Sequence, residues 1–281
     1  TIALGGGEPF LHPDLFVIAH YARSRNIVPN ITTNGLIMDP TLAERCRVFG
    51  SVHVSCHHPS DLSHLAKPVR LLKQAGIDIG MNVLLSAESH AELPRIWAWG
   101  AQHGISRILL LKIKMTEHNW DCQDLVLPPA DEQVLLPRLR QLARRHSIMP
   151  MLDCSLFPAF AFTRPKRSDL ERFDVNGCVG GNAILAVTSD GYYKPCSFCA
   201  APCGDARLLN RYQLKENQAL AQFRRLRIHS ACGGCKYKDL CNGGCGVSMT
   251  EWCHDDKTVH SCFYGGGQAA PSHPEGTGAA L

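Results

Sequence analysis

The chain has 281 residues, of which 45% are hydrophobic, and a net charge of +4. This length and composition allow one large domain with a buried core and a second, smaller domain. The charges are scattered, without the basic arm or acidic tail that indicates nucleic-acid binding, and no apolar run is long enough to cross a bilayer. We therefore expect neither nucleic acid nor a membrane as a partner.

Short apolar runs alternate with amphipathic stretches through the first half of the chain. The runs, each expected to form a strand, cover residues 2–4, 27–32, 52–55, 77–85 and 108–113. Helical periodicity begins at Pro13 and after Asp39-Pro40, and it returns over residues 61–75, 91–103 and 131–146. Repeated βα units predict a parallel α/β sheet, either a barrel or a doubly wound sheet, with ligands at the carboxyl ends of its strands.

Glycines and one carboxylate follow the first of these runs, in the sequence Gly5-Gly6-Gly7-Glu8. Glycines let a ligand approach the backbone closely, and Glu8 beside exposed carbonyl groups suits an ammonium group. A tight βα turn with no ligand is the alternative interpretation. The sequence Thr-Asn-Gly, ending at Gly35, follows the second run and is also an ordinary turn.

Two polar residues belong to the next runs. Ser55 ends the third run and could donate a hydrogen bond to a carboxylate or a ribose. Asn82 lies between apolar neighbours in the fourth, and a polar side chain there needs a partner, which is either a ligand or the backbone.

The second half of the chain is rich in cysteine, with most of its 14 cysteines between Cys178 and Cys262. One β-hairpin is predicted over residues 183–196, with Asp190-Gly191 as its turn, and one helix over residues 214–227. Disulfide scaffolds are usually short secreted chains, whereas CxxC pairs in a cytoplasmic protein favour an iron–sulfur cluster or a zinc ribbon. We expect a cytoplasmic, metal-binding protein.

These motifs together resemble the radical S-adenosylmethionine (SAM) enzymes that carry a SPASM domain, which holds auxiliary iron–sulfur clusters. The resemblance rests on GGEP, TNG and the strand-end serine, and on a seven-cysteine pattern with one glycine. That pattern here is Cys178, Gly191, Cys196, Cys232, Cys235, Cys241, Cys245 and Cys262. The resemblance implies a partial (β/α)6 barrel over residues 1–155, a SPASM domain with a β-hairpin over 156–265, and a disordered tail over 266–281.

The resemblance also implies the cofactors and their ligands. SAM would be bound by Gly6, Gly7, Glu8, Ser55 and Asn82. An outer [4Fe–4S] cluster would be bound by Cys232, Cys235, Cys241 and Cys262, with Cys253 competing for the last position. An inner [4Fe–4S] cluster would be bound by Cys178, Cys196 and Cys245. Its fourth ligand is open between Cys199, which spacing favours slightly, Cys154, Cys203 and an iron site left free for substrate.

One departure from the family pattern concerns catalysis. The CxxxCxxC motif, which binds the SAM-cleaving cluster and precedes GGEP in the family, is absent from this sequence. We interpret the chain as truncated before that motif, so that its catalytic residues are unknown and a third cluster is expected on the missing segment.

By resemblance, the whole protein generates a 5′-deoxyadenosyl radical to modify a peptide or protein, as maturases of ribosomal peptides and sulfatases do. The alternatives are an oxidoreductase in haem-type cofactor synthesis and a non-catalytic iron–sulfur or zinc protein. A peptide substrate and a reductant such as flavodoxin or ferredoxin are the expected partners.

Overall fold

A computed structural model describes residues 1–114, 122, 125–157, 160, 165–173, 175–226, 235–245, 247, 251–252 and 259–260. Cys232, Cys253, Cys262 and the expected tail lie outside these residues. None of the helices within the described ranges is long and apolar enough to cross a membrane.

The first half forms a six-stranded sheet in which neighbours in sequence are neighbours in space and every pair is parallel. This confirms the predicted parallel α/β fold. The strands are β1 (Ile2–Leu4), β2 (Pro29–Thr33), β3 (Val52–Cys56), β4 (Ile79–Leu85), β5 (Arg107–Lys112) and β6 (Met149–Leu152). Only β6 was not among the five predicted runs.

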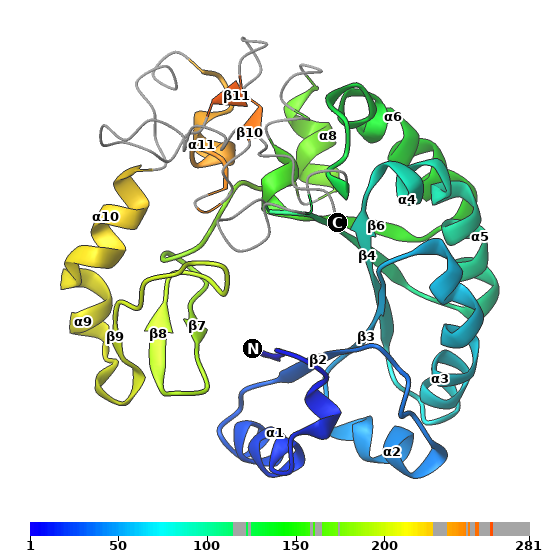
Figure 1. The fold of residues 1–281 in the computed structure, drawn as a ribbon, viewed down its shortest axis with the longest axis horizontal. Coiled ribbons are helices and arrows are strands. Elements are labelled where there is room, and N and C mark those ends of the chain that lie inside the picture. Colours follow the sequence, from blue (N-terminus) through cyan, green and yellow to red (C-terminus); the bar gives the residue numbers. More distant parts are fainter. Residues whose placement is uncertain are drawn as a thin grey trace, which may run out of the picture.

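Helices cover the convex side of the curved sheet, and its concave side faces the second half of the chain (Figure 1). These helices are α1 (Leu15–Ser24), α2 (Pro40–Arg45), α3 (Leu62–Gln74), α4 (Ala87–Ala91), α5 (Leu93–His103) and α6 (Pro129–His146). Strand side chains alternate between the two faces. On β4, Met81 and Val83 are buried under the helices, whereas Asn82 and Leu84 point to the other face and are half-buried. The concave face is thus the more open one.

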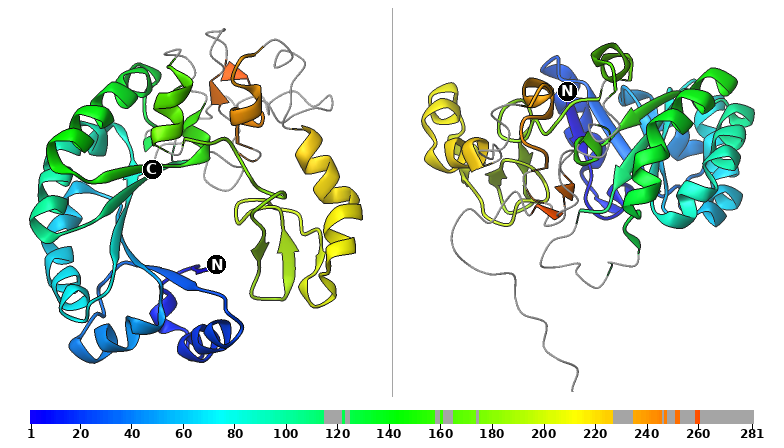
Figure 2. Two further views of the ribbon diagram at one scale, coloured as in Figure 1. Left: turned by 180° about the vertical axis from the view of Figure 1, so that it is seen from behind. Right: turned by 90° about the horizontal axis from the view of Figure 1, so that it is seen from above.

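The second half contains a separate antiparallel sheet of β7 (Ala186–Val187), β8 (Tyr192–Lys194) and β9 (Gly204–Asp205). β7 and β8 form the predicted hairpin, and Gly191 in its turn has a φ of 87°. The predicted single helix is wrong: two helices, α9 (Arg211–Glu216) and α10 (Gln218–Leu226), meet at Asn217. Figure 2 shows them on the outer side of the small sheet.

Short elements complete the described chain. They are α8 (Arg167–Arg172), α11 (Lys238–Cys241), β10 (Glu251–Trp252) and β11 (Val259–His260). Buried Tyr237, directly before α11, donates a hydrogen bond from its hydroxyl group to the carbonyl of Pro165 at 2.8 Å, and its ring packs edge-on against Phe157. The turn that contains Cys235 and Cys241 is therefore attached to the segment that follows β6.

Candidate cofactor sites

The GGEP and TNG loops lie side by side at the carboxyl ends of β1 and β2. Both carboxylate oxygens of Glu8 are engaged there. Oε1 accepts hydrogen bonds from the Thr33 hydroxyl group at 2.9 Å and the Phe10 amide at 3.3 Å, and Oε2 accepts one from the Asn34 amide at 2.9 Å. The Glu8 side chain thus fixes one loop on the other.

The glycines before Glu8 are exposed, and Gly6 has a φ of 134°, which a residue with a Cβ rarely adopts. Among the described atoms, nothing lies within 4 Å of a Cβ added at Gly6 or Gly7. Their backbone groups are therefore accessible to a ligand, while the Glu8 carboxylate is occupied by protein donors.

Asn82 belongs to a polar row on the concave face. Its Oδ1 lies 2.7 Å from Nδ1 of His53, and its amide nitrogen donates to the Thr32 hydroxyl group at 3.3 Å. The His53 ring lies over Gly80, where an added Cβ would come within 2.4 Å of the ring. Burial lowers the pKa of His53, so the ring is held neutral and can donate from Nδ1 to Asn82.

Ser55 lies beside this row. It pairs in register with Asn82 across β3 and β4, and it is half-buried on the same face. Ser55 and Asn82, which the sequence places on two separate predicted strands, are therefore neighbours. His53, which the sequence analysis did not single out, supports Asn82 through its hydrogen bond.

Three cysteines from distant segments meet near the end of β6. The Cys154 side chain hydrogen-bonds with that of Cys178, and Cys245 lies close enough to raise the pKa of Cys154 further. Cys178 and Cys245 are buried, and the Gly180 amide donates to the Cys178 sulfur at 3.4 Å. Cys178 and Cys245, predicted as inner ligands, are thus both brought to Cys154.

The fourth sulfur of this region is Cys196, which follows β8. Backbone amides of Phe198 and Cys199 hydrogen-bond to it, and Cys178 influences its pKa. The loop before it contacts the Cys178 loop through a hydrogen bond from the Gly181 amide to the Pro195 carbonyl at 2.9 Å. Amide donors to sulfur are a usual feature of iron–sulfur sites, where they tune the reduction potential.

The two predicted cluster regions are in direct contact. The Gly177 amide donates to the Leu240 carbonyl at 2.7 Å, and a Cβ added at Gly177 would lie 1.6 Å from the Cys241 carbonyl oxygen. Of the four predicted outer ligands, Cys235 and Cys241 are described and half-buried, at the two ends of the turn that contains α11. The other two fall outside the described residues.

A buried ion pair, which sequence reasoning missed, lies beside the inner cysteines. Lys114, two residues after β5, is paired with Asp153, and both side chains are less than a tenth exposed. The Lys114 ammonium also lies 4.6 Å from the centre of the Phe198 ring, within the Cys196–Cys199 turn. The sequence offered only a lysine just after an apolar run as a signal, because Asp153 lies 39 positions away.

Cysteine, the residue type gathered here, is the ligand that an iron–sulfur cluster takes. Burial raises the pKa of Cys196, and hydrogen bonding to Cys178 followed by burial raises that of Cys154. Such thiols become thiolates when a metal binds them. A [4Fe–4S] cluster takes one thiolate on each iron. Its protein ligands are therefore spread around the cluster and do not converge on a single ion. No three His, Cys, Asp or Glu side chains in the described ranges are arranged around one ion.

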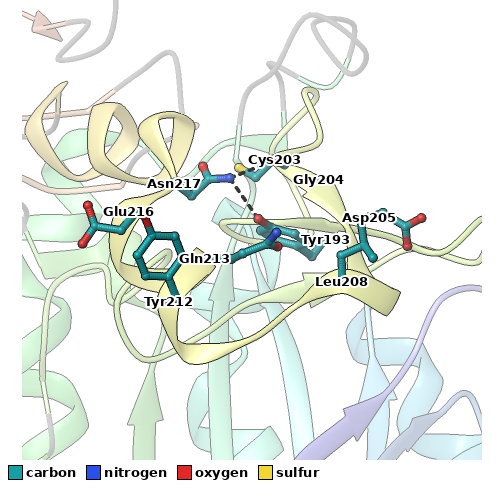
Figure 3. A pocket seen from close by; sticks show the side chains of 9 residues that line it. All are labelled: Tyr193, Cys203, Gly204, Asp205, Leu208, Tyr212, Gln213, Glu216 and Asn217. Carbon is teal, nitrogen blue, oxygen red and sulfur yellow. Dashed lines mark hydrogen bonds between the residues drawn. The ribbon is translucent and has the colours of Figure 1, made fainter.

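A hollow of the small sheet lies elsewhere, between β8, β9 and α9 (Figure 3). It measures about 320 Å³ and is bordered by Tyr193, Tyr212 and Asn217. Of the cysteines considered as cluster ligands, only Cys203 lines it. This hollow is therefore separate from the cofactor sites predicted from the sequence.

No family model matches the chain. Curated relatives include the AdoMet-dependent heme synthase of Methanosarcina barkeri, 22% identical over 271 residues, covering 86% of this chain and 76% of that protein. The PqqA peptide cyclase of Granulibacter bethesdensis is 24% identical over 207 residues, covering 68% of this chain and 53% of that protein. The chain thus spans about half the length of the cyclase.

Solved structures agree on the fold. The structure of anSMEcpe with bound AdoMet and Kp18Cys peptide superposes with a TM-score of 0.65 at 16% identity, covering 93% of this chain and 79% of that one. The relatives and the fold agree with the resemblance that the sequence motifs indicated. The chain is therefore similar in sequence to the AdoMet-dependent heme synthase and the PqqA peptide cyclase, and it shares the fold of anSMEcpe.

Proposed function

We propose that the chain forms the barrel and auxiliary-cluster parts of a radical SAM enzyme that modifies a peptide or protein. The observation that carries this proposal is the fold. Nearly the whole chain superposes on anSMEcpe, which holds AdoMet and a peptide in its solved structure, and the sequence relatives include a peptide cyclase. In this proposal residues 1–155 are the barrel and residues 156–265 the SPASM domain.

The proposed SAM site lies at the carboxyl ends of β1 to β4. The accessible carbonyl groups of Gly6 and Gly7 meet the SAM amine, and Glu8 contributes by holding their loop on the TNG loop. Ser55 and Asn82 meet the carboxylate or the ribose from the concave face. The geometry that supports this assignment is the shared edge of the sheet and the His53 hydrogen bond that orients Asn82.

The proposed auxiliary sites are two. Cys178, Cys196 and Cys245 hold the inner cluster, and Cys232, Cys235, Cys241 and Cys262 hold the outer one. Two observations support the inner site. Cys178 and Cys245 both lie close to Cys154, and backbone amides donate hydrogen bonds to the sulfurs of Cys178 and Cys196. When bound, SAM and the clusters supply one-electron chemistry at an unactivated carbon. A flavodoxin or ferredoxin in a reducing cytoplasm would supply the electrons.

Haem-type synthesis is the second candidate, because the heme synthase of Methanosarcina barkeri covers 86% of this chain, more than the cyclase does. The two candidates differ in the substrate that the concave face receives. A peptide is extended and carries its own hydrogen-bonding backbone, whereas a porphyrin is a flat macrocycle with carboxylate side chains.

The test uses the product of the whole coding sequence, reconstituted with iron and sulfide without oxygen and mixed with SAM and a reductant. Small peptides encoded beside the gene are added in one series, and an iron porphyrin precursor in the other. The proposal expects a mass change in a peptide together with release of 5′-deoxyadenosine. Conversion of the porphyrin with unchanged peptides would establish the second candidate instead.

A further inference from the structure

Cys154 lies where the barrel meets the cysteine-rich segment. It begins a short 3-10 turn, Cys154–Leu156, directly after β6. Asp153 caps this turn by accepting a hydrogen bond from the Ser155 amide at 3.0 Å, and its other carboxylate oxygen is paired with Lys114. The backbone before Cys154 is tied to β5, because the Asp153 amide donates to the Leu110 carbonyl at 3.0 Å. Cys154 is therefore held by the barrel.

The three inner cysteines reach the same place from the other half of the chain. Cys178 hydrogen-bonds with the Cys154 side chain, and Cys245 lies close enough to Cys154 to raise its pKa further. The turn that contains Cys196 packs on the same ion pair, since the Phe198 ring covers the Lys114 ammonium at 4.6 Å. Arg224 of α10 fixes the Cys178 loop by donating to the Gly181 carbonyl at 2.7 Å.

Cys199 occupies a different environment, although its spacing from Cys196 is the more familiar one. The groups that influence its pKa, after burial, are the Ala201 amide and the Lys194 ammonium. It in turn influences Cys203, on the side of the small sheet that carries the hollow in Figure 3. Cys199 also lies beside Cys196, whose pKa it influences, whereas the Cys154 side chain is in contact with that of Cys178.

We infer that Cys154 is the fourth thiolate of the inner cluster, so that the barrel supplies one ligand and the cysteine-rich segment supplies three. This inference rests on the proposed function, because it requires that the chain bind an inner [4Fe–4S] cluster. Four thiolates, one for each iron, complete the protein coordination of such a cluster. The cluster then joins the two halves of the chain covalently, and it leaves no iron open to a substrate.

The test compares Cys154→Ala with the matched variant Cys199→Ala in the reconstituted full chain. We measure iron and sulfide per chain and the electron paramagnetic resonance spectrum of the reduced protein. Cys154→Ala is expected to lose the inner-cluster signal, or to convert it to that of a three-iron cluster, with the outer signal unchanged. Cys199→Ala is expected to match the wild type in both measurements.

A third variant, Cys154→Ser, guards against misfolding, because it preserves size and offers an oxygen ligand. It is expected to keep the iron but to change the spectrum and the reduction potential of the inner cluster. An unchanged inner signal in both Cys154 variants would overturn the inference, whether Cys199→Ala loses that signal or not. A wild-type chain that takes up no iron would instead contradict the proposed function, so the two failures are distinguishable.

Discussion

At the scale of single residues, the Lys114–Asp153 pair places a positive charge next to the thiols of the inner site. Asp153 precedes Cys154, and the Lys114 ammonium interacts with Cys154 and Cys245 as well as with Asp153. Burial alone would raise the pKa of Asp153, but Lys114 and the Ser155 hydrogen bonds lower it overall, so the pair is ionised. Charge close to the sulfurs is one of the terms that set the potential of an iron–sulfur cluster.

Removing either charge should therefore move the potential, in opposite directions. Lys114→Met makes the inner cluster harder to reduce and lowers its midpoint potential, whereas Asp153→Asn raises it. The potential is measured by a redox titration monitored by paramagnetic resonance. Lys112→Met is the control, because it breaks another buried pair, with Glu132 at 2.8 Å, that belongs to the helix-covered side of β5.

Both lysine variants leave a carboxylate buried without its partner, so each should destabilise the fold, by about 3–5 kcal/mol. Only the Lys114 variant should also move the potential. Equal potentials in all three variants and the wild type would show that the pair is structural alone.

A second prediction for single residues concerns Gly80, which lies under the His53 ring. A side chain there would displace the His53 ring, which an added Cβ would approach to 2.4 Å, and would remove the hydrogen bond that orients Asn82. Gly80→Ala should lower the free energy of unfolding by roughly 1–3 kcal/mol, as overpacking does, and should weaken SAM binding in calorimetry.

The double variant His53→Ala/Gly80→Ala provides the control, since it removes the clash but also the hydrogen bond. It should recover the stability of His53→Ala alone, with SAM binding still weakened. If the double variant is no more stable than Gly80→Ala, the ring contact is not the cause of the loss.

At the scale of elements, close contact between loops brings the two cluster regions together. Gly177 has no room for a side chain, because an added Cβ would overlap the Cys241 carbonyl group, which is backbone and cannot rotate away. Gly177→Ala should therefore separate the Cys178 loop from α11 and reduce the iron bound per chain. Gly191→Ala is the matched control, since its added Cβ meets no described atom although its φ of 87° is strained. Equal iron content in the two variants would contradict this role for Gly177.

Asn217 separates α9 from α10 through three hydrogen bonds. Its Oδ1 accepts from the Leu220 amide at 2.9 Å, and its amide nitrogen donates at 2.9 Å to the Tyr193 hydroxyl group and to the Cys203 carbonyl (Figure 3). Asn217→Ala should lower the free energy of unfolding by about 1–3 kcal/mol. Asn217→Asp keeps the acceptor for Leu220 and should lose less in the same denaturation experiment. An equal loss would assign the whole effect to the two donated bonds.

These elements also show how far sequence reasoning reaches. The βα alternation predicted five strands, because buried parallel strands are continuous apolar runs bounded by turn residues. The alternation did not predict β6, because Pro150 interrupts its apolar run. Proline is tolerated there because β6 is an edge strand of the sheet. The break at Asn217 depends on Tyr193 and Cys203, which are not local in sequence. The Lys114–Asp153 pair joins residues 39 positions apart, so only the folded chain reveals it.

At the scale of the whole molecule, the parallel sheet and the cysteine-rich segment form facing halves of an open ring (Figures 1 and 2). The polar row with Asn82 lies on the concave side of the sheet, and Cys154 lies at the end of its last strand. A substrate bound against the concave face would thus have the proposed SAM site on one side and the inner cluster on the other.

The most direct test of this arrangement is the metal content of the anaerobically purified and reconstituted chain, with the spectrum of its reduced form. Two auxiliary clusters predict about eight iron and eight sulfide per chain, since each [4Fe–4S] cluster holds four of each. Two paramagnetic signals with separate potentials should appear on reduction. A chain that retains zinc, takes up no iron and keeps its fold would contradict the assignment of this protein as a cluster-binding enzyme.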